Sequence, residues 1–144
     1  MKNITKKLPK KNNAADGQKA RNDNTFYKVG RIRYNSWAAI VLKACDIIVY
    51  DRELVHIYNR HRKELDKLGF SAFEYVKFIV NNFNEIYNGK LDRKLLAVKS
   101  VGISHYAVVE LVFERNKYVI KTAVSVETQR LSKLELLCAN ARRT

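Results

Sequence analysis

Two histidines are the first candidates for chemistry, because the sequence has no Gly-rich phosphate loop, HExxH, CxxC or GxSxG motif. His56 and His61 lie in a segment whose apolar residues repeat at three and four positions, which predicts an amphipathic helix over residues 52–68. At about 100° per residue, His61 falls within the apolar stripe and His56 about 140° away, beside basic residues. We expect His61 to face the sheet or a cleft, and His56 to face solvent or a bound anion. The alternatives are a hydrogen-bonded core histidine at 61 and a solvated surface residue at 56.

A second candidate site lies on the last two predicted strands. With a turn centred on Arg115-Asn116, one face of this hairpin is almost wholly apolar, and the other carries Glu110, Lys121, Ser125 and Tyr106. This register places Glu110 directly opposite Lys121. A slip by one residue would send the apolar residues to the wrong face, so the pattern predicts this register. The pair is then either an ordinary cross-strand ion pair or part of a concave site that handles a phosphodiester.

Short elements must position these residues. Asp51 is the predicted N-cap of the first helix, and Gly69 is its predicted end. Ser71 and Glu74 form a capping box for a second helix, which we expect to continue through Ile86 and to end at Asn88-Gly89. Strands are expected at 26–34 and 47–50, with a short buried helix at 36–43 between them.

The spacing of the apolar residues changes after the second predicted helix. Three closely spaced segments rich in Val, Ile, Tyr and Phe predict antiparallel strands at Lys94–Lys99, Ile103–Glu114 and Lys117–Val126, with one turn at Gly102. Thr128 then begins a closing helix whose Leu131, Leu134 and Leu137 face the sheet. The predicted fold is therefore α+β: N-terminal helices packed on one face of a small antiparallel sheet of three to five strands, with a closing C-terminal helix.

The charge of the chain favours a polyanionic partner. The net charge is +14, and residues 25–144 carry 21 basic against 12 acidic side chains, so the excess is not confined to the N-terminus. We expect residues 25–144 to form one domain and the basic segment 1–24 to be a disordered tail. That tail is either a solubilising segment or linker, or an arm that helps to hold nucleic acid. No run of about 20 apolar residues and no signal peptide is visible, which predicts a cytoplasmic protein without a membrane partner.

Several short motifs, taken in order, resemble the phage and mobile-element branch of the barnase, EndoU, colicin and RelE-like nuclease superfamily. They are Val55-His56-Ile57, Arg60-His61, Lys67-Leu68-Gly69-Phe70, the run from Phe78 to Tyr87, Ala107 to Leu111, and Tyr118 to Ala123. The resemblance covers roughly residues 29–137. It implies helices on a four- or five-stranded antiparallel sheet, and an endoribonuclease that needs no metal or cofactor. It also implies RNA, with tRNA favoured, as the substrate, and a cognate inhibitor or immunity protein as a further partner.

The resemblance implies a role for each candidate residue. Metal-free RNA cleavage needs a base for the 2′-hydroxyl proton, an acid for the leaving oxygen and a cation for the growing charge on the phosphate. The implied catalytic residues are His56, His61, Lys121 and Glu110. The implied substrate-binding residues are Arg60 and Lys121 for phosphate, Thr122 and Ser125 as hydrogen-bond donors, and Tyr106 or Tyr118 for base stacking.

Two other functions fit the same sequence. The first is a basic RNA- or DNA-binding module without catalysis, in which the helix histidines are inert. The second is an inactive copy of the fold that acts as an adaptor in a mobile element. Cleavage of total tRNA in the presence of EDTA separates the nuclease from both alternatives.

Overall fold

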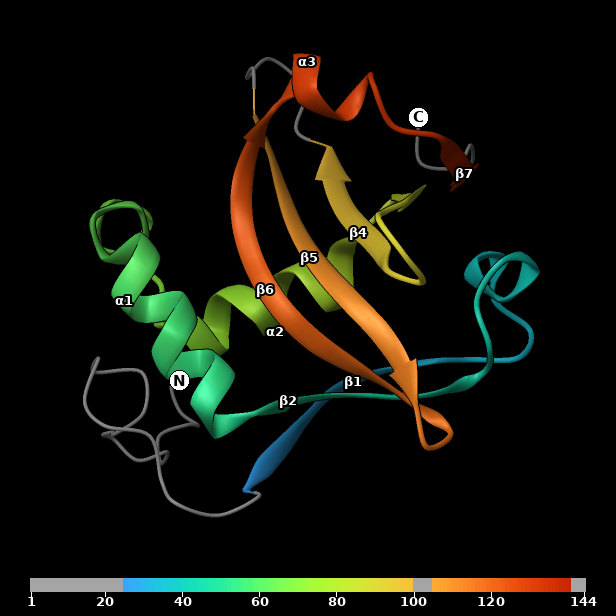
Figure 1. Cartoon of the computed structure of the whole chain (residues 1–144), viewed down its shortest axis with the longest axis horizontal. Helices are drawn as coiled ribbons and strands as arrows, with labels where there is room; N and C mark the ends of the chain where they lie inside the picture. The colour runs from blue at the N-terminus through green and yellow to red at the C-terminus, as the bar shows by residue number, and fades with distance from the viewer. Residues whose placement is uncertain (1–24, 100–104, 141–144) are drawn as a thin grey trace.

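The computed structural model describes residues 25–99 and 105–140 (Figure 1). The predicted basic tail and the turn predicted at Gly102 lie outside these residues. In chain order the elements are β1 (Phe26–Ile32), the 3-10 helix η2 (Trp37–Ile40), β2 (Cys45–Tyr50), α1 (Asp51–Leu68), α2 (Ala72–Asn82), β3 (Glu85–Asn88), β4 (Lys94–Lys99), β5 (His105–Glu114), β6 (Lys117–Glu127), α3 (Thr128–Leu131) and β7 (Leu136–Ala139).

The predicted sheet of three to five antiparallel strands is wrong. All seven strands join one sheet in the order β1-β2-β6-β5-β4-β3-β7. The sheet is mixed because β2 pairs in parallel with β6, through Ile47 with Tyr118 and Ile48 with Val119. It is larger than predicted because β3 and β7, from segments that were expected to be helical, join the five strands β1, β2, β4, β5 and β6 that the sequence predicts.

Local signals place the first helix and the start of the second correctly. Gly69 ends α1 with a left-handed φ of 78°, as its place after the last helical turn predicts. Ser71 and Glu74 make both bonds of the predicted capping box. The Glu74 backbone N–H donates to Ser71 Oγ at 3.0 Å, and the Ser71 backbone N–H donates to Glu74 Oε1 at 2.9 Å. Asp51 differs from its prediction by one position, because it is the first residue of α1 and Tyr50 is the N-cap.

The second helix ends earlier than its apolar stripe predicts. α2 stops at Asn82, and Phe83 already has extended backbone angles. The side-chain amides of Asn81 and Asn82 donate to backbone carbonyls four residues earlier, a local bonding pattern that competes with the helix. Ile86 is then buried in the core on one face of the sheet and Tyr87 on the other, which a strand allows and one helix face does not.

The predicted closing helix is also wrong. α3 has four residues, after which the chain forms β7 against β3. Of the three leucines expected on one helix face, Leu131 is buried, Leu134 is exposed and Leu137 is half-buried. β7 supplies hydrogen bonds that β3 would otherwise lack on that side, and the flanking backbone bonds from Asn88 to Glu135 and from Asn140 to Asn84 extend this pairing.

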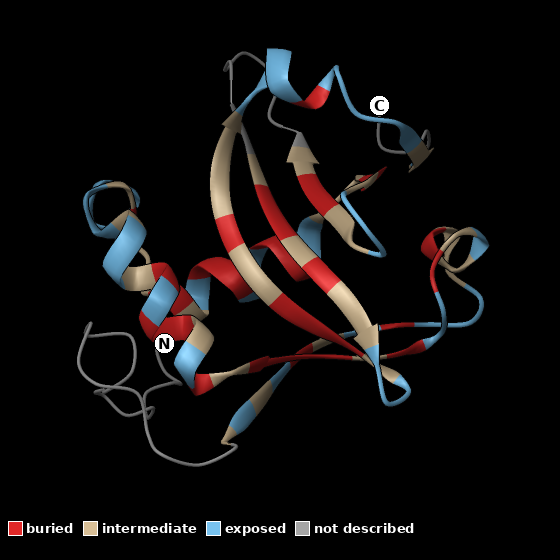
Figure 2. Cartoon of the chain, viewed as in Figure 1, coloured by how far each residue is buried: buried red, intermediate tan, exposed pale blue. Residues whose placement is uncertain are grey.

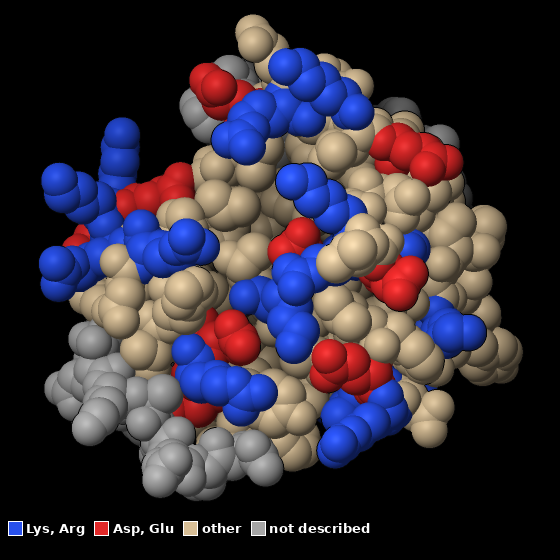
Figure 3. All heavy atoms as spheres, viewed as in Figure 1, with Lys and Arg blue, Asp and Glu red and all other residues tan. Residues whose placement is uncertain are grey.

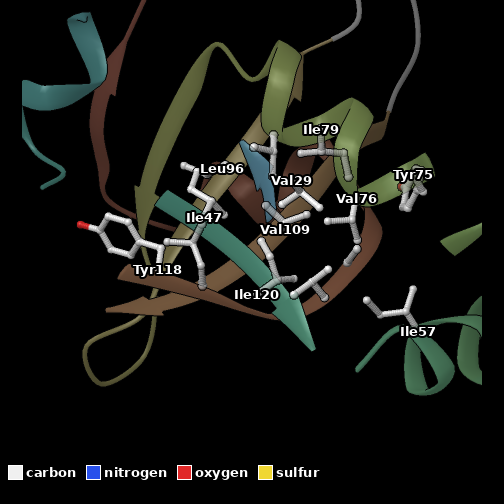
Figure 4. Packing of buried hydrophobic residues seen from close by; sticks show 14 of the residues in the cluster. Val29, Ile47, Ile57, Tyr75, Val76, Ile79, Leu96, Val109, Tyr118 and Ile120 are labelled. Carbon is white, nitrogen blue, oxygen red and sulfur yellow. The ribbon is translucent and has the colours of Figure 1, made fainter. Parts of the chain in front are cut away.

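Two apolar clusters occupy the two faces of the sheet. The larger one joins α1 and α2 to β1 through β6, and Figure 4 shows Val29, Val76, Ile79 and Val109 close together at its centre. The smaller one, on the other face, contains Tyr87, Ala97, Val108 and Leu131. Buried and half-buried stretches follow one another along β5 and β6 in Figure 2, where the strands run in front of α2. The sheet therefore separates a side covered by α1 and α2 from a side with a smaller apolar cluster.

Candidate nucleic-acid interface

The exposed face of α1 carries a line of basic residues, which we call the basic stripe: Arg52, His56, Arg60, Lys63 and Lys67. At 100° per residue, Arg52, His56 and Arg60 lie within an arc of about 80° before the non-helical residue His61, and Lys63 and Lys67 follow after it. All five are exposed, whereas the opposite face of α1 is buried in the larger cluster. Lys and Arg side chains gather over α1 at the left of Figure 3. The helix therefore presents one basic surface to solvent and one apolar surface to the sheet.

Most of the basic stripe is not neutralised. Arg52 is the exception, because its Nε lies 3.8 Å from Glu53 Oε2 and its guanidinium lies 4.5 Å from the Tyr50 ring centroid. Arg60, Lys63 and Lys67 make no ion pair with any residue that the structure describes. Cations without a protein partner are available to an anionic ligand.

His61 interrupts the helix beside this stripe. Its backbone angles, φ −126° and ψ 24°, are not helical, so α1 bends there. Its Nδ1 lies 3.6 Å from Glu64 Oε1, and its side chain is 22% exposed. Burial lowers the pKa of His61 below its ordinary value, Glu64 opposes this effect, and the neighbouring Arg60 and His56 add to it. The imidazole is therefore neutral at neutral pH, the form that can accept a proton.

The hairpin of β5 and β6 departs from its predicted register after the four pairs nearest the turn. The turn is at Arg115-Asn116 as predicted, and both residues have positive φ, as a two-residue hairpin turn requires. Leu111 still lies opposite Ile120. Beyond this pair a β-bulge inserts Lys121 as an extra residue, so that Glu110 lies opposite Thr122. The prediction that Glu110 and Lys121 are directly opposite is therefore wrong.

Glu110 and Lys121 each have another partner. Arg93 Nη1 donates to Glu110 Oε1 at 2.7 Å, and Lys121 Nζ lies 3.6 Å from Glu114 Oε2. Sequence reasoning missed Arg93, which lies in the connection before β4, where no periodic pattern marks it. The Glu110 carboxylate is already paired with a guanidinium and is not an unpaired base.

The sheet separates these charged residues from the histidines. Val109 and Leu111 of β5 point into the larger cluster beneath α1 and α2, so Glu110 points to the opposite face. Among the described residues, no hydrogen bond or ion pair joins His56 or His61 to Glu110 or Lys121. The four residues predicted as catalytic are not brought together in one site.

The predicted substrate-binding residues are also dispersed. Arg60 belongs to the basic stripe, and Thr122 lies half-buried opposite Glu110. Ser125 lies opposite Ala107, whose side chain packs against the larger cluster. Tyr118 is only 4% exposed, and its hydroxyl accepts a hydrogen bond from the Lys43 backbone N–H at 3.0 Å, so its ring is not open to a base. Tyr106 lies in β5, and its side chain is outside the described part of the structure.

Comparisons with family models, curated proteins and solved structures give no match to this chain. Within residues 25–99 and 105–140, none of the helices has the length and apolar character needed to cross a membrane.

Proposed function

We propose that this chain binds RNA through the basic stripe of α1. The observation that carries the proposal is the set of exposed cations Arg60, Lys63 and Lys67, which have no ion-pair partner among the described residues. From Arg52 to Lys67 the stripe follows about 22 Å of helix, counted along the axis through the bend at His61. One nucleic-acid strand has a phosphate about every 3.4 Å of duplex axis, so the stripe is long enough to follow several phosphates.

The overall charge and the resemblance support the same proposal. The excess of Lys and Arg extends well beyond the N-terminal segment, which raises non-specific affinity for a polyanion. The order of short motifs resembles ribonucleases, which favours RNA over an acidic protein. Such a role is consistent with a cytoplasmic location.

Charge reversal on the stripe tests this proposal. We expect Arg60→Glu/Lys63→Glu to weaken binding to a fluorescent RNA duplex about tenfold or more, measured by anisotropy at fixed salt. Lys90→Glu/Lys133→Glu is the matched control, because it changes the net charge equally at exposed positions outside α1. Equal losses in the two variants would show that total charge, rather than the stripe, governs binding.

A second proposal, metal-independent RNA cleavage, rests on His61. A neutral, half-buried imidazole at a helix bend next to Arg60 can take the proton of a 2′-hydroxyl while a cation holds the phosphate. The 2′-oxygen would bond to phosphorus, the bond from phosphorus to the 5′-oxygen would break, and His56 or water would return a proton to that oxygen. A cognate inhibitor would then be a further partner.

Cleavage of total tRNA with EDTA present decides between the two proposals. If His61 is the base, the wild type should cut tRNA under these conditions, and His61→Gln should bind it without cutting. Binding by the wild type without any product would instead assign the chain to the non-catalytic alternatives. Bacterial growth during expression of the two proteins gives an independent readout.

A further inference from the structure

A second basic site lies at the end of the β1–β2 pair where η2 connects the two strands. This connection borders a half-open pocket of about 370 Å³ lined by Arg31, Arg33, Tyr34, Asn35 and Ala44. In Figure 1 it is the blue-green loop at the right, across the molecule from α1. It is therefore distinct from the basic stripe and is not part of the site already described.

A tight turn positions the pocket's aromatic and amide side chains. The backbone N–H of Ser36 donates to the Arg33 carbonyl at 3.0 Å, and Ser36 Oγ donates to the same oxygen at 2.7 Å. Tyr34 and Asn35 are the two central residues of this turn, where side chains project away from the chain. Tyr34 is 85% exposed, and its ring contacts no other aromatic ring among the described residues. An exposed aromatic face is suited to stacking on another planar ring.

The charges at the pocket favour an anion. Arg31 Nη1 donates to Asp46 Oδ1, and Lys28 Nζ lies 3.3 Å from the same oxygen. These two cations hold the pKa of Asp46 below its usual range, so one carboxylate remains ionised between them. Arg33 makes no ion pair with a described residue. The local charge is therefore positive even after the one acid is counted.

We propose that this pocket binds an unpaired nucleotide of single-stranded RNA, a role that rests on the RNA binding proposed above. Tyr34 stacks on the base, the Asn35 amide hydrogen-bonds its edge, and Arg33 binds the adjacent phosphate. Bases inside a duplex cannot use this site, because they are stacked on one another and do not offer a free face.

Strand β2 links the two sites. It runs from Cys45, next to the pocket residue Ala44, to Tyr50, which directly precedes α1. Six strand residues span roughly 20 Å, so an RNA on the stripe could extend an unpaired end into the pocket. The ligand that uses both sites is a duplex with a single-stranded overhang.

The test compares a blunt RNA duplex with the same duplex carrying an overhang of eight adenosines, using the full chain. We expect the wild type to bind the overhang probe more tightly. Tyr34→Ala should reduce this advantage about fivefold to a hundredfold and leave blunt-duplex binding unchanged, because one base-stacking contact is lost. Tyr34→Phe should retain the advantage. Ile40→Ala, which shortens an exposed apolar side chain in the same connection, is the control and should also retain it.

The outcomes separate this proposal from the function on which it rests. If Tyr34→Ala keeps the full overhang advantage, or if the wild type gains nothing from the overhang, the pocket is not a nucleotide site and the stripe proposal stands. If the wild type binds neither probe, both proposals fail. If inorganic phosphate competes with the overhang probe as well as adenosine 5′-monophosphate does, the pocket is only an anion site. That result would overturn the role of Tyr34.

Discussion

At Gly30 the backbone of β1 approaches α2 so closely that a side chain has no room. An ideal Cβ at this position would lie 2.4 Å from Val80 Cγ1. Because a β-branched valine cannot easily rotate away, we expect Gly30→Ala to lower the free energy of unfolding by about 1–3 kcal/mol. Urea denaturation measures the loss.

A double-mutant cycle is the control for that clash. Val80→Ala alone leaves a cavity and destabilises, but in the Gly30→Ala background it also makes room for the new methyl group. The double variant should therefore be more stable than the sum of the two single losses predicts. Simple additivity would contradict the close approach of β1 and α2.

The lowered pKa of His61 predicts a pH dependence of stability. The unfolded state binds a proton near the ordinary histidine pKa of 6.5, whereas folded His61 stays neutral to a lower pH. Stability should therefore fall as pH drops below about 6.5, because the unfolded state then binds more protons. We expect His61→Gln to remove this part of the pH dependence, measured by urea midpoints between pH 7.5 and 5. The same dependence in His61→Gln as in the wild type would show that another group causes it.

At the scale of elements, the C-terminal segment distinguishes the observed structure from a closing helix. Leu131 is 2% exposed in the smaller cluster, whereas Leu134 is 38% and Leu136 is 50% exposed. We expect Leu131→Ala to lower the free energy of unfolding by about 2–4 kcal/mol and Leu134→Ala to lower it much less. Thermal or urea unfolding of the two variants measures both losses. Comparable losses at Leu131, Leu134 and Leu137 would instead support a helix that packs all three on the sheet.

For the whole molecule, the excess of positive charge predicts a steep salt dependence of RNA binding. Each phosphate neutralised contributes roughly 0.7–0.9 to the slope of log affinity against log salt. We expect affinity to fall steeply between about 50 and 200 mM salt, and Arg60→Glu/Lys63→Glu to have a shallower slope than the wild type. An affinity that does not change over this range would count against nucleic acid as the partner.

The sequence by itself determined the features that depend on local bonding and alternation. These include α1 with its end at Gly69, the capping box of Ser71 and Glu74, and the turn at Arg115-Asn116. Each is specified within a few residues, by a side-chain bond to the backbone or by a backbone angle. The part of the basic stripe before the bend at His61 is equally local, because the spacing of Arg52, His56 and Arg60 defines one helix face.

Only the tertiary structure decided the sheet and the partners of its charged residues. The segment from Phe83 to Asn88 fits a helix or a strand by its apolar pattern, and pairing with β4 and β7 decides in favour of a strand. The bulge at Lys121 moves Glu110 away from its predicted partner, and Arg93, from a connection without a pattern, takes that place. Such pairings join residues far apart in the chain, and their free energy is gained only when the whole sheet forms, so no short window of sequence contains them.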